Sequence, residues 1–306
     1  MGKLAHVVDV QNTKSIGEML RQSQTNYSPV MVPAEVNGAK AGGFKAIIRP
    51  DINEVIGTVA SRYRMNDHRA HLMALEPAVQ SGMITPASVS MWDNGAVLAY
   101  QFRVSDLDAV IQGAHGKDMV SPLLTLAFAY GFPLSDSAFF ADFRWFCKNQ
   151  LGKVAELTKG CRVQHKGDVN SRYAELLGSR VKELGGELAG RYEAMRRMTG
   201  TTLQGRALVE YVGQVIQASQ EDVERAWVAP KEECKGNAAR IHEVIECHAV
   251  DDCNAPGTVY HAYNALTRWQ SHHAGRNEAT RTRSMLLGAG SNTAARAWET
   301  AARMVG

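Results

Sequence analysis

The sequence of 306 residues has no long apolar run and few cysteines. No window approaches the roughly 18 uninterrupted apolar residues of a membrane-spanning helix, and the N-terminal residues lack the apolar core and cleavage site of a secretion signal. The five cysteines are odd in number and form no paired framework, which is typical of free thiols in a reducing compartment. They are Cys147, Cys161, Cys234, Cys247 and Cys253. We therefore expect a cytoplasmic protein without membrane contact.

The sequence also lacks the motifs by which common enzyme sites are recognised. It has no GxxxxGK followed by Ser or Thr, no GxGxxG after a strand, no HExxH and no GxSxG. Gly288-Ala289-Gly290 could cradle a phosphate at the start of the last helical stretch, but such a segment is more often a plain loop between helices. We expect no cofactor and no enzyme activity. An enzyme with an unrecognised site stays open as a third alternative.

What is present is the composition of a globular protein with unevenly distributed charge. Apolar residues make up 45% and charged residues 21% of the chain, which is close to the average for folded domains. Lys and Arg outnumber Asp and Glu from Arg144 to Arg206 and from Arg268 to the end, whereas carboxylates outnumber cations from Gly213 to Pro256. Positive blocks attract phosphate, although the same pattern also occurs on ordinary solvated helices.

Turn residues and apolar periodicity divide the chain into three parts. Residues 1–43, punctuated by Pro29, Pro33 and several glycines, are expected to form a lead-in or pairing arm. Residues 44–165 contain apolar runs with short polar connections, which indicate strands with one or two helices. Residues 166–306 carry apolar positions at helical spacing. The sequence therefore predicts an α+β protein, with a mostly antiparallel sheet in the N-terminal half and a helical C-terminal half.

Individual elements are predicted inside these parts. The runs FKAIIR and VIGTVASRYR indicate a hairpin, and DHRAHLMALEPAVQSG indicates a helix that Pro77 cuts short. Asp93-Asn94-Gly95 is a predicted turn between two further strands. FCKNQLGKVAELTKG is predicted to be a helix. A long amphipathic helix is expected from Asp168, with further helices over residues 203–217, 221–228, 237–250, 258–272 and 293–305.

One group of nitrogen and sulfur side chains has the residue types that zinc accepts. It consists of Cys234, His242, Cys247, His248 and Cys253. Their spacing argues against a site, because structural zinc sites use close cysteine pairs and these cysteines are well separated. We expect thiols beside unrelated histidines and no bound metal. His272-His273 is interpreted as a pair of imidazoles at a helix C-terminus.

Two stretches combine cations with aromatic or amide side chains, as single-stranded nucleic-acid sites do. Arg62-Tyr63-Arg64 places cations on both sides of a ring, although a solvated strand end with Tyr63 in the core explains the pattern equally well. The second stretch begins in FRWFCKNQ and continues through the basic segment that follows. Its candidate residues are Arg144, Lys148, Asn149, Gln150, Lys153, Lys159, Arg162, His165, Lys166 and Arg172. Spaced cations of this kind could follow a sugar-phosphate backbone, with the amides hydrogen bonding to it.

The order and spacing of five fragments give the sequence a family resemblance. The fragments are VIGTVASRYRMND, FRWFCKNQL, RVQHKGDVNSRYAELL, GTVYHAYNALTRWQSHH and RSMLLGAGSNTAARAWE. With them the chain resembles the phage/plasmid-like family of unknown function, which is found on phages, prophages and conjugative plasmids. The N-terminal lead departs from the pattern, because it lacks the tryptophan-histidine-glycine opening of many relatives. The resemblance implies a mobile-element protein in the cytoplasm of a bacterial host.

The order of strands and helices is also similar, at the level of the fold, to the single-strand annealing proteins of the Redβ/RecT and Rad-type groups. This similarity implies an ATP-independent protein that binds and anneals single-stranded DNA in a groove and forms homo-oligomers. The groove candidates are Arg62, Arg64, Arg144, Lys148 and Lys153. Uncovered strand edges are a second reason to expect self-association. The alternative is an interaction or host-defence-antagonist protein, for which the acidic segment 213–256 would bind a basic partner.

Overall fold

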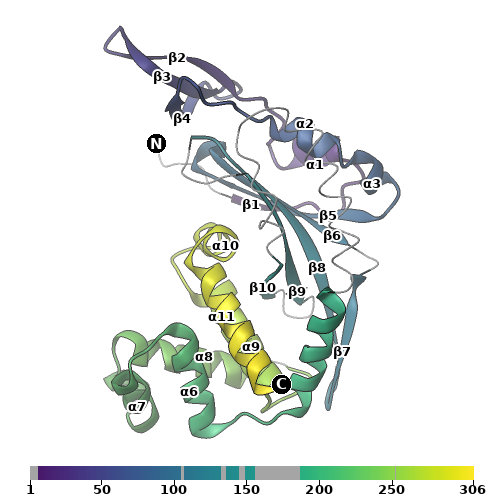
Figure 1. Ribbon diagram of the computed structural model, residues 1–306, viewed down its shortest axis with the longest axis vertical. Helices are drawn as coiled ribbons and strands as arrows, with labels where there is room; N and C mark the ends of the chain where they lie inside the picture. Colours follow the sequence, from purple (N-terminus) through teal and green to yellow (C-terminus); the bar gives the residue numbers. More distant parts are fainter. Residues whose placement is uncertain (1–5, 105–106, 132–135, 145–148, 156–186, 252) are drawn as a thin grey trace. The chain divides into compact units, whose positions relative to one another are not determined.

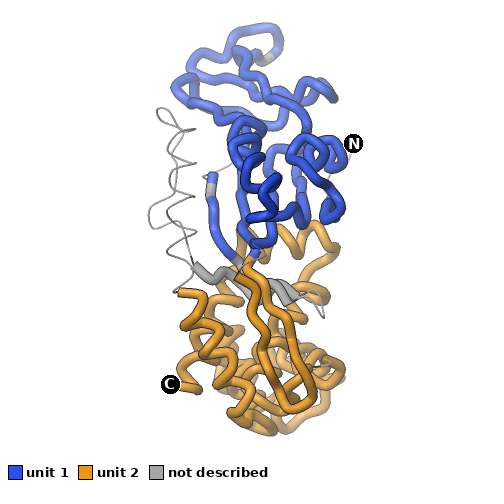
Figure 2. Tube along the Cα trace, turned by 90° about the vertical axis from the view of Figure 1, so that its right-hand side faces the viewer, with its two compact units in different colours: residues 1–106, 123–140, 155–185 blue, residues 107–122, 141–154, 186–306 orange. Residues whose placement is uncertain are grey.

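The computed structural model describes residues 6–104, 107–131, 136–144, 149–155, 187–251 and 253–306. The chain divides into two compact units, which Figure 2 shows in different colours. Unit 1 comprises Met1–Asp106, Leu123–Phe140 and Ala155–Gly185, and unit 2 comprises Leu107–Pro122, Ala141–Val154 and Gly186–Gly306. The chain therefore passes from one unit to the other several times.

A seven-stranded sheet contains most of the strands (Figure 1). Its order is β1-β5-β6-β8-β9-β10, and β7 pairs with β8. The strands are β1 (His6–Asp9), β5 (Ile84–Trp92), β6 (Val97–Val104), β7 (Ala109–Gly113), β8 (Gly116–Ala129), β9 (Ser137–Arg144) and β10 (Asn149–Ala155). The pairs β1–β5, β5–β6, β6–β8 and β7–β8 are antiparallel. The predicted antiparallel sheet of the N-terminal half is confirmed.

A second, three-stranded antiparallel sheet belongs to unit 1. It is built from β2 (Val30–Val36), β3 (Ala39–Arg49) and β4 (Glu54–Ala60). Asn37 and Gly38 connect β2 with β3 at φ values of 52° and 79°, as a two-residue Asn-Gly hairpin turn requires. Strands β3 and β4 are the hairpin predicted from FKAIIR and VIGTVASRYR.

The described residues of unit 1 also form three short α-helices, α1 (Ile16–Gln22), α2 (His68–Met73) and α3 (Glu76–Gln80). The single helix expected from DHRAHLMALEPAVQSG is two helices. The reason is that Pro77 lacks a backbone N–H and occupies the first turn of α3, where no N–H is needed. The stretch expected as a lead-in contains β1, α1, β2 and the beginning of β3, and it buries Ile16 and Met19 completely.

The helical part of unit 2 begins with a helix over residues 187–200. It continues with α6 (Gly205–Ile216), α7 (Gln220–Val228), η3 (Lys231–Glu233), α8 (Gly236–Val250), α9 (Val259–Arg268), η4 (Trp269–His273), α10 (Glu278–Leu287) and α11 (Ala289–Met304). These elements confirm the predicted helical C-terminal half. The sequence does not predict α10, in which only Met285 and Leu286 are buried. Among the described residues, no helix combines the length and the apolar character that crossing a bilayer requires.

One predicted element is wrong. FCKNQLGKVAELTKG, expected to be a helix, contains strand β10, which lies next to β9 in the seven-stranded sheet. Pairing with a neighbouring strand overrides local helix propensity, which Gly152 already lowers. The long helix expected from Asp168 lies outside the described residues as far as residue 186.

Candidate nucleic-acid interface

The predicted Arg62-Tyr63-Arg64 site lies directly after β4. The Tyr63 hydroxyl donates to the backbone carbonyl of Ala129, 3.5 Å away, at the end of β8. Burial, followed by the nearby Asp136 carboxylate, raises the pKa of Tyr63 above its ordinary value. Arg62 and Arg64 are exposed on either side of it. Tyr63 therefore faces the protein, and the two arginines face solvent.

A different aromatic residue, Phe44, lies on the strand that pairs with the segment just before these arginines. Phe44 pairs with Ala60 across β3 and β4, and the N–H of Ser61 donates to the Gly43 carbonyl at 2.8 Å. Arg62 follows Ser61 directly in the chain. The side chain of Phe44 is 55% exposed. Sequence reasoning does not select Phe44, because the alternation in FKAIIR identifies two strand faces without showing which one is open. Phe44 takes the place of Tyr63 as the accessible ring.

Phe44 belongs to an apolar face of the three-stranded sheet that is open to solvent. Cross-strand partners share a face, so the pairs Val30–Ile48 and Ile48–Val55 align three branched side chains in a row. Val30 is 47% exposed and Val55 is 62% exposed. We call this surface the open face; it consists of Val30, Val32, Phe44, Ala46, Ile48, Val55, Thr58 and Ala60. A contiguous exposed apolar patch of this kind indicates a binding site.

The opposite face of the same sheet is fixed to the rest of unit 1. Ile47 and Val59 are buried on that side. A Cβ on Gly57 would lie 2.6 Å from the Tyr130 carbonyl oxygen and 3.0 Å from the Gly131 Cα. Only glycine permits the two backbones to approach so closely. This contact holds one face of the sheet against unit 1 and leaves the open face outward.

A buried arginine holds the end of β3. The Arg49 guanidinium donates to the Asp51 carboxylate at 2.9 Å and to the carbonyls of Gln24 and Asn94 at 3.0 and 3.1 Å. It also lies over the Tyr27 ring, 4.2 Å from the ring centroid. The positive charge of Arg49 is thus compensated by partners inside the protein. Arg49 is therefore a structural cation and does not reach phosphate.

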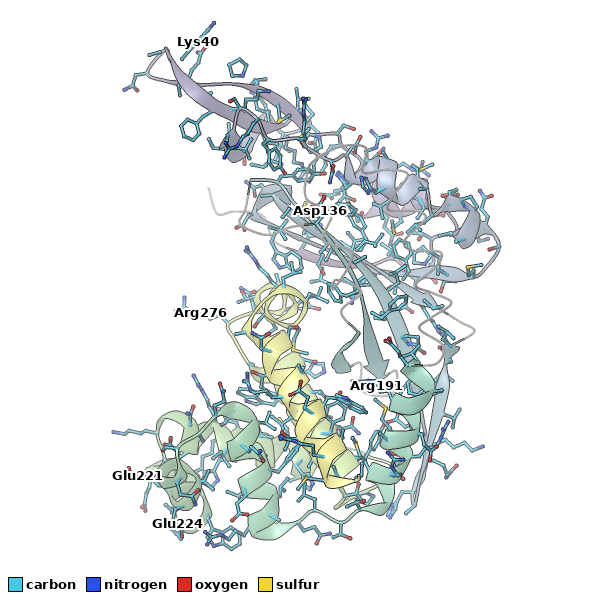
Figure 3. The ribbon with its side chains drawn as sticks, viewed as in Figure 1. Lys40, Asp136, Arg191, Glu221, Glu224 and Arg276 are labelled. Carbon is cyan, nitrogen blue, oxygen red and sulfur yellow. The ribbon has the colours of Figure 1, made fainter. Side chains whose placement is uncertain are left out.

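The cations that follow β4 in the chain differ from Arg49. Neither Arg62 nor Arg64 forms an ion pair with a residue that the structure describes. Lys40 lies at the tip of the β2–β3 hairpin (Figure 3), where the strand register places a carboxylate residue, Glu35, opposite it. Two free cations beside an exposed ring and a flat apolar surface can bind phosphates together with unstacked bases.

The second predicted stretch is described only in part. Arg144 ends β9, and Asn149, Gln150 and Lys153 lie on the neighbouring strand β10. The backbone therefore brings these four residues onto two adjacent strands of one sheet. The remaining candidates lie outside the described residues; they are Lys148, Lys159, Arg162, His165, Lys166 and Arg172.

The residues considered as zinc ligands have other contacts. Cys234, Cys247 and Cys253 are buried free thiols, and burial raises the pKa of Cys247 to about 11. The Nε2 atom of His242 lies 3.1 Å from a backbone carbonyl oxygen, and His248 stacks on another histidine ring at 3.6 Å between centroids. Within the described ranges, no group of three or more His, Cys, Asp or Glu side chains could hold a metal ion.

Gly288 lies between α10 and α11, and Ala289 and Gly290 are the first residues of α11. The Gly290 N–H donates to the Ser284 hydroxyl at 3.1 Å. A Cβ on Gly288 or Gly290 would approach Ser284 to 3.2 or 3.0 Å. The glycines therefore allow the two helices to pack closely, and the Gly290 amide is used inside the protein.

The fold is that of an α+β protein, and its three-stranded sheet has an exposed apolar face next in the chain to two exposed arginines. Residues 55–298 match the model of a family described as a domain of unknown function, DUF932, and the protein belongs to this family. The match begins in β4 and includes Arg62 and Arg64, whereas Phe44 precedes it. No curated protein and no solved structure matches the chain.

Proposed function

We propose that the protein binds single-stranded DNA and speeds the annealing of complementary strands without ATP. The observation that carries this proposal is the open face, an exposed apolar surface on which Phe44 pairs with Ala60 at the end of β4, directly before the segment with the exposed Arg62 and Arg64. The resemblance to the phage/plasmid-like family supports a role for a phage, prophage or plasmid inside a bacterial host cell.

Stacking and charge have separate roles in this binding. Unpaired bases stack on aromatic side chains, and one such base contributes about 1–3 kcal/mol. Bases in a duplex are already stacked on one another, so the open face favours single strands. Arg62 and Arg64 attract the phosphates of any sequence, and this attraction weakens as salt is added. Binding is therefore independent of sequence and sensitive to salt.

Annealing follows from the same weak contacts. A strand that lies on a flat surface does not fold back on itself, and its bases are held loosely enough for a complementary strand to displace them. The sequence has no phosphate-binding loop of the ATPase type. We therefore expect the annealing of DNA strands to be driven by binding free energy alone.

The test measures the binding of fluorescent oligo-dT by anisotropy at several salt concentrations. Replacing Arg62 and Arg64 together with alanine should flatten the log-log salt slope by about 1.4, because each phosphate neutralised on a single strand contributes about 0.7. Phe44→Ala should weaken binding by at least about fivefold and leave the slope unchanged, because stacking is not an ion-exchange reaction. Stopped-flow annealing of complementary strands should slow in both variants.

Tyr63→Phe and Lys235→Ala are matched controls for these variants. Tyr63 faces the protein, and Lys235 is an exposed cation in unit 2, so neither substitution should change DNA affinity. If the folded Phe44 and arginine variants bind DNA as the wild type does, the interface is wrong. If the wild type does not bind single-stranded DNA at low salt, the open face is a protein-docking surface. The interaction or host-defence-antagonist alternative then replaces this proposal.

A further inference from the structure

The outer face of helix α7 in unit 2 is a second exposed apolar surface, and it differs from the open face in charge. Trp227 is 46% exposed and Val228 is 69% exposed. Four carboxylates lie near them on α7 and on the following turn η3, together with one exposed cation, Arg225, whose guanidinium donates to the Glu233 backbone carbonyl at 3.2 Å. We call this surface the acidic face; it consists of Glu221, Glu224, Trp227, Val228, Glu232 and Glu233.

The sequence directs these side chains outward. A capping box formed by Ser219 and Asp222 starts α7. Val223 and Ala226 are the buried residues of the helix, and Val223 packs against α6 where Gly213 has no Cβ. The remaining face of α7 points to solvent, and Figure 3 shows Glu221 and Glu224 on the outside of the helix.

The acidic face has an excess of negative charge. The Arg206 guanidinium neutralises Glu224 at 2.7 Å. Glu221, Glu232 and Glu233 form no ion pair with any residue in the described part of the chain. These carboxylates repel phosphate, so DNA does not occupy this surface. A partner for it must be apolar at its centre and positively charged at its rim.

The open face of unit 1 has these two properties. Its centre is a row of branched side chains with Phe44, and the exposed cations Arg62 and Arg64, which form no ion pair with a described residue, directly follow its edge strand β4 in the chain. We propose that the acidic face of one copy docks on the open face of a second copy. The argument rests on complementary charge and on matching apolar centres, and it holds whether or not the open face also binds DNA.

The geometry of such an assembly follows from the two surfaces. They are different, so each contact joins the acidic face of one copy to the open face of another copy. Sedimentation distinguishes a closed dimer or ring from a growing filament, the two outcomes that such contacts allow. The assembly weakens with salt, because its charges are screened. Any single strand that occupies the open face competes with it.

Sedimentation velocity without DNA tests the proposal. The wild type should associate at low salt and dissociate at high salt. A variant with Arg62→Glu and Arg64→Glu and a variant with Glu221→Lys and Glu232→Lys should each be monomeric alone. A mixture of the two should form a one-to-one dimer that does not grow, because the first keeps an acidic face and the second keeps an open face.

A control variant with Arg240→Glu and Arg276→Glu has the same charge change as the arginine variant but alters neither surface, and it should associate as the wild type does. Circular dichroism establishes that each variant is folded. A wild type that is monomeric at low salt, or a mixture that stays monomeric, would overturn the proposal. The Glu221→Lys, Glu232→Lys variant keeps the open face, so its binding of oligo-dT tests the proposed function without self-association. The DNA-binding proposal and the self-association proposal can therefore fail independently.

Discussion

Lowering the pH from 7 to 5 should destabilise the protein through His68. The ring is fully buried. Its Nε2 atom lies 2.9 Å from the Thr25 carbonyl oxygen, and its Nδ1 atom lies 2.7 Å from the Tyr130 hydroxyl oxygen. A carbonyl only accepts, so Nε2 carries the proton and Nδ1 accepts from Tyr130. The neutral imidazole is thus completely hydrogen bonded, and a second proton would occupy Nδ1, which could then no longer accept from the hydroxyl.

The magnitude follows from the difference between the folded and unfolded states. Burial lowers the pKa of His68 to about 4, from an ordinary value of 6.5. The unfolded state therefore takes up the proton first, and the stability that His68 contributes is lost as the pH falls from about 6.5 toward 4. At pH 5 this linkage removes about 2 kcal/mol of unfolding free energy relative to pH 7. This loss is large, because the total unfolding free energy of a native protein is only about 5–15 kcal/mol.

Urea denaturation at both pH values measures the effect. His68→Gln removes the titration, so its loss of unfolding free energy between pH 7 and 5 should be about 2 kcal/mol smaller than that of the wild type. Replacing the exposed His273 with Gln is the control and should leave the wild-type pH dependence intact. Equal losses in the wild type and in His68→Gln would refute the reasoning. So would an NMR titration in which the His68 ring protonates near pH 6.5.

Two further perturbations test the packing and the second basic stretch. Gly57→Ala should lower the unfolding free energy by about 1–3 kcal/mol, because the new Cβ would lie 2.6 Å from a backbone oxygen. Gly42→Ala is the control and should leave the unfolding free energy unchanged, because a Cβ on Gly42 would meet no atom within 4 Å. Thermal unfolding of both variants measures the difference. Replacing Arg144, Lys148 and Lys153 together with alanine should weaken oligo-dT binding for every sequence alike and flatten the salt slope by about two units. An unchanged slope in the folded triple variant would remove these residues from the interface.

Elements with a local signal could be predicted from the sequence. The β3–β4 hairpin and the Asp93-Asn94-Gly95 turn follow from strand-forming runs on either side of turn residues. Helix α6 follows from apolar residues at helical spacing, of which Leu208, Val212 and Val215 are buried. In each case the interactions that fix the element lie within a few residues of one another.

Elements that depend on distant partners could not be predicted in the same way. Strand β10 lies beside β9, and β1 pairs with β5, where His6 is opposite Met91. Helix α10 buries two residues, so its amphipathic pattern is weak. Most of the free energy that holds such elements comes from tertiary contacts, which a local pattern does not contain.

The same distinction explains why the sequence reveals only half of the candidate interface. Arg62 and Arg64 are charged wherever they lie, so a search for cations finds them. The ring beside them is set by the fold, because the chain turns after β4, where the Tyr63 N–H donates to the Ala60 carbonyl at 2.9 Å, and this turn directs Tyr63 inward. Strand register then places Phe44 opposite Ala60. A slip of one residue in this register would exchange the two faces of β3 and bury Phe44. A search for such sites in related sequences should therefore examine the strand paired with the basic residues, as well as the residues adjacent to them in the chain.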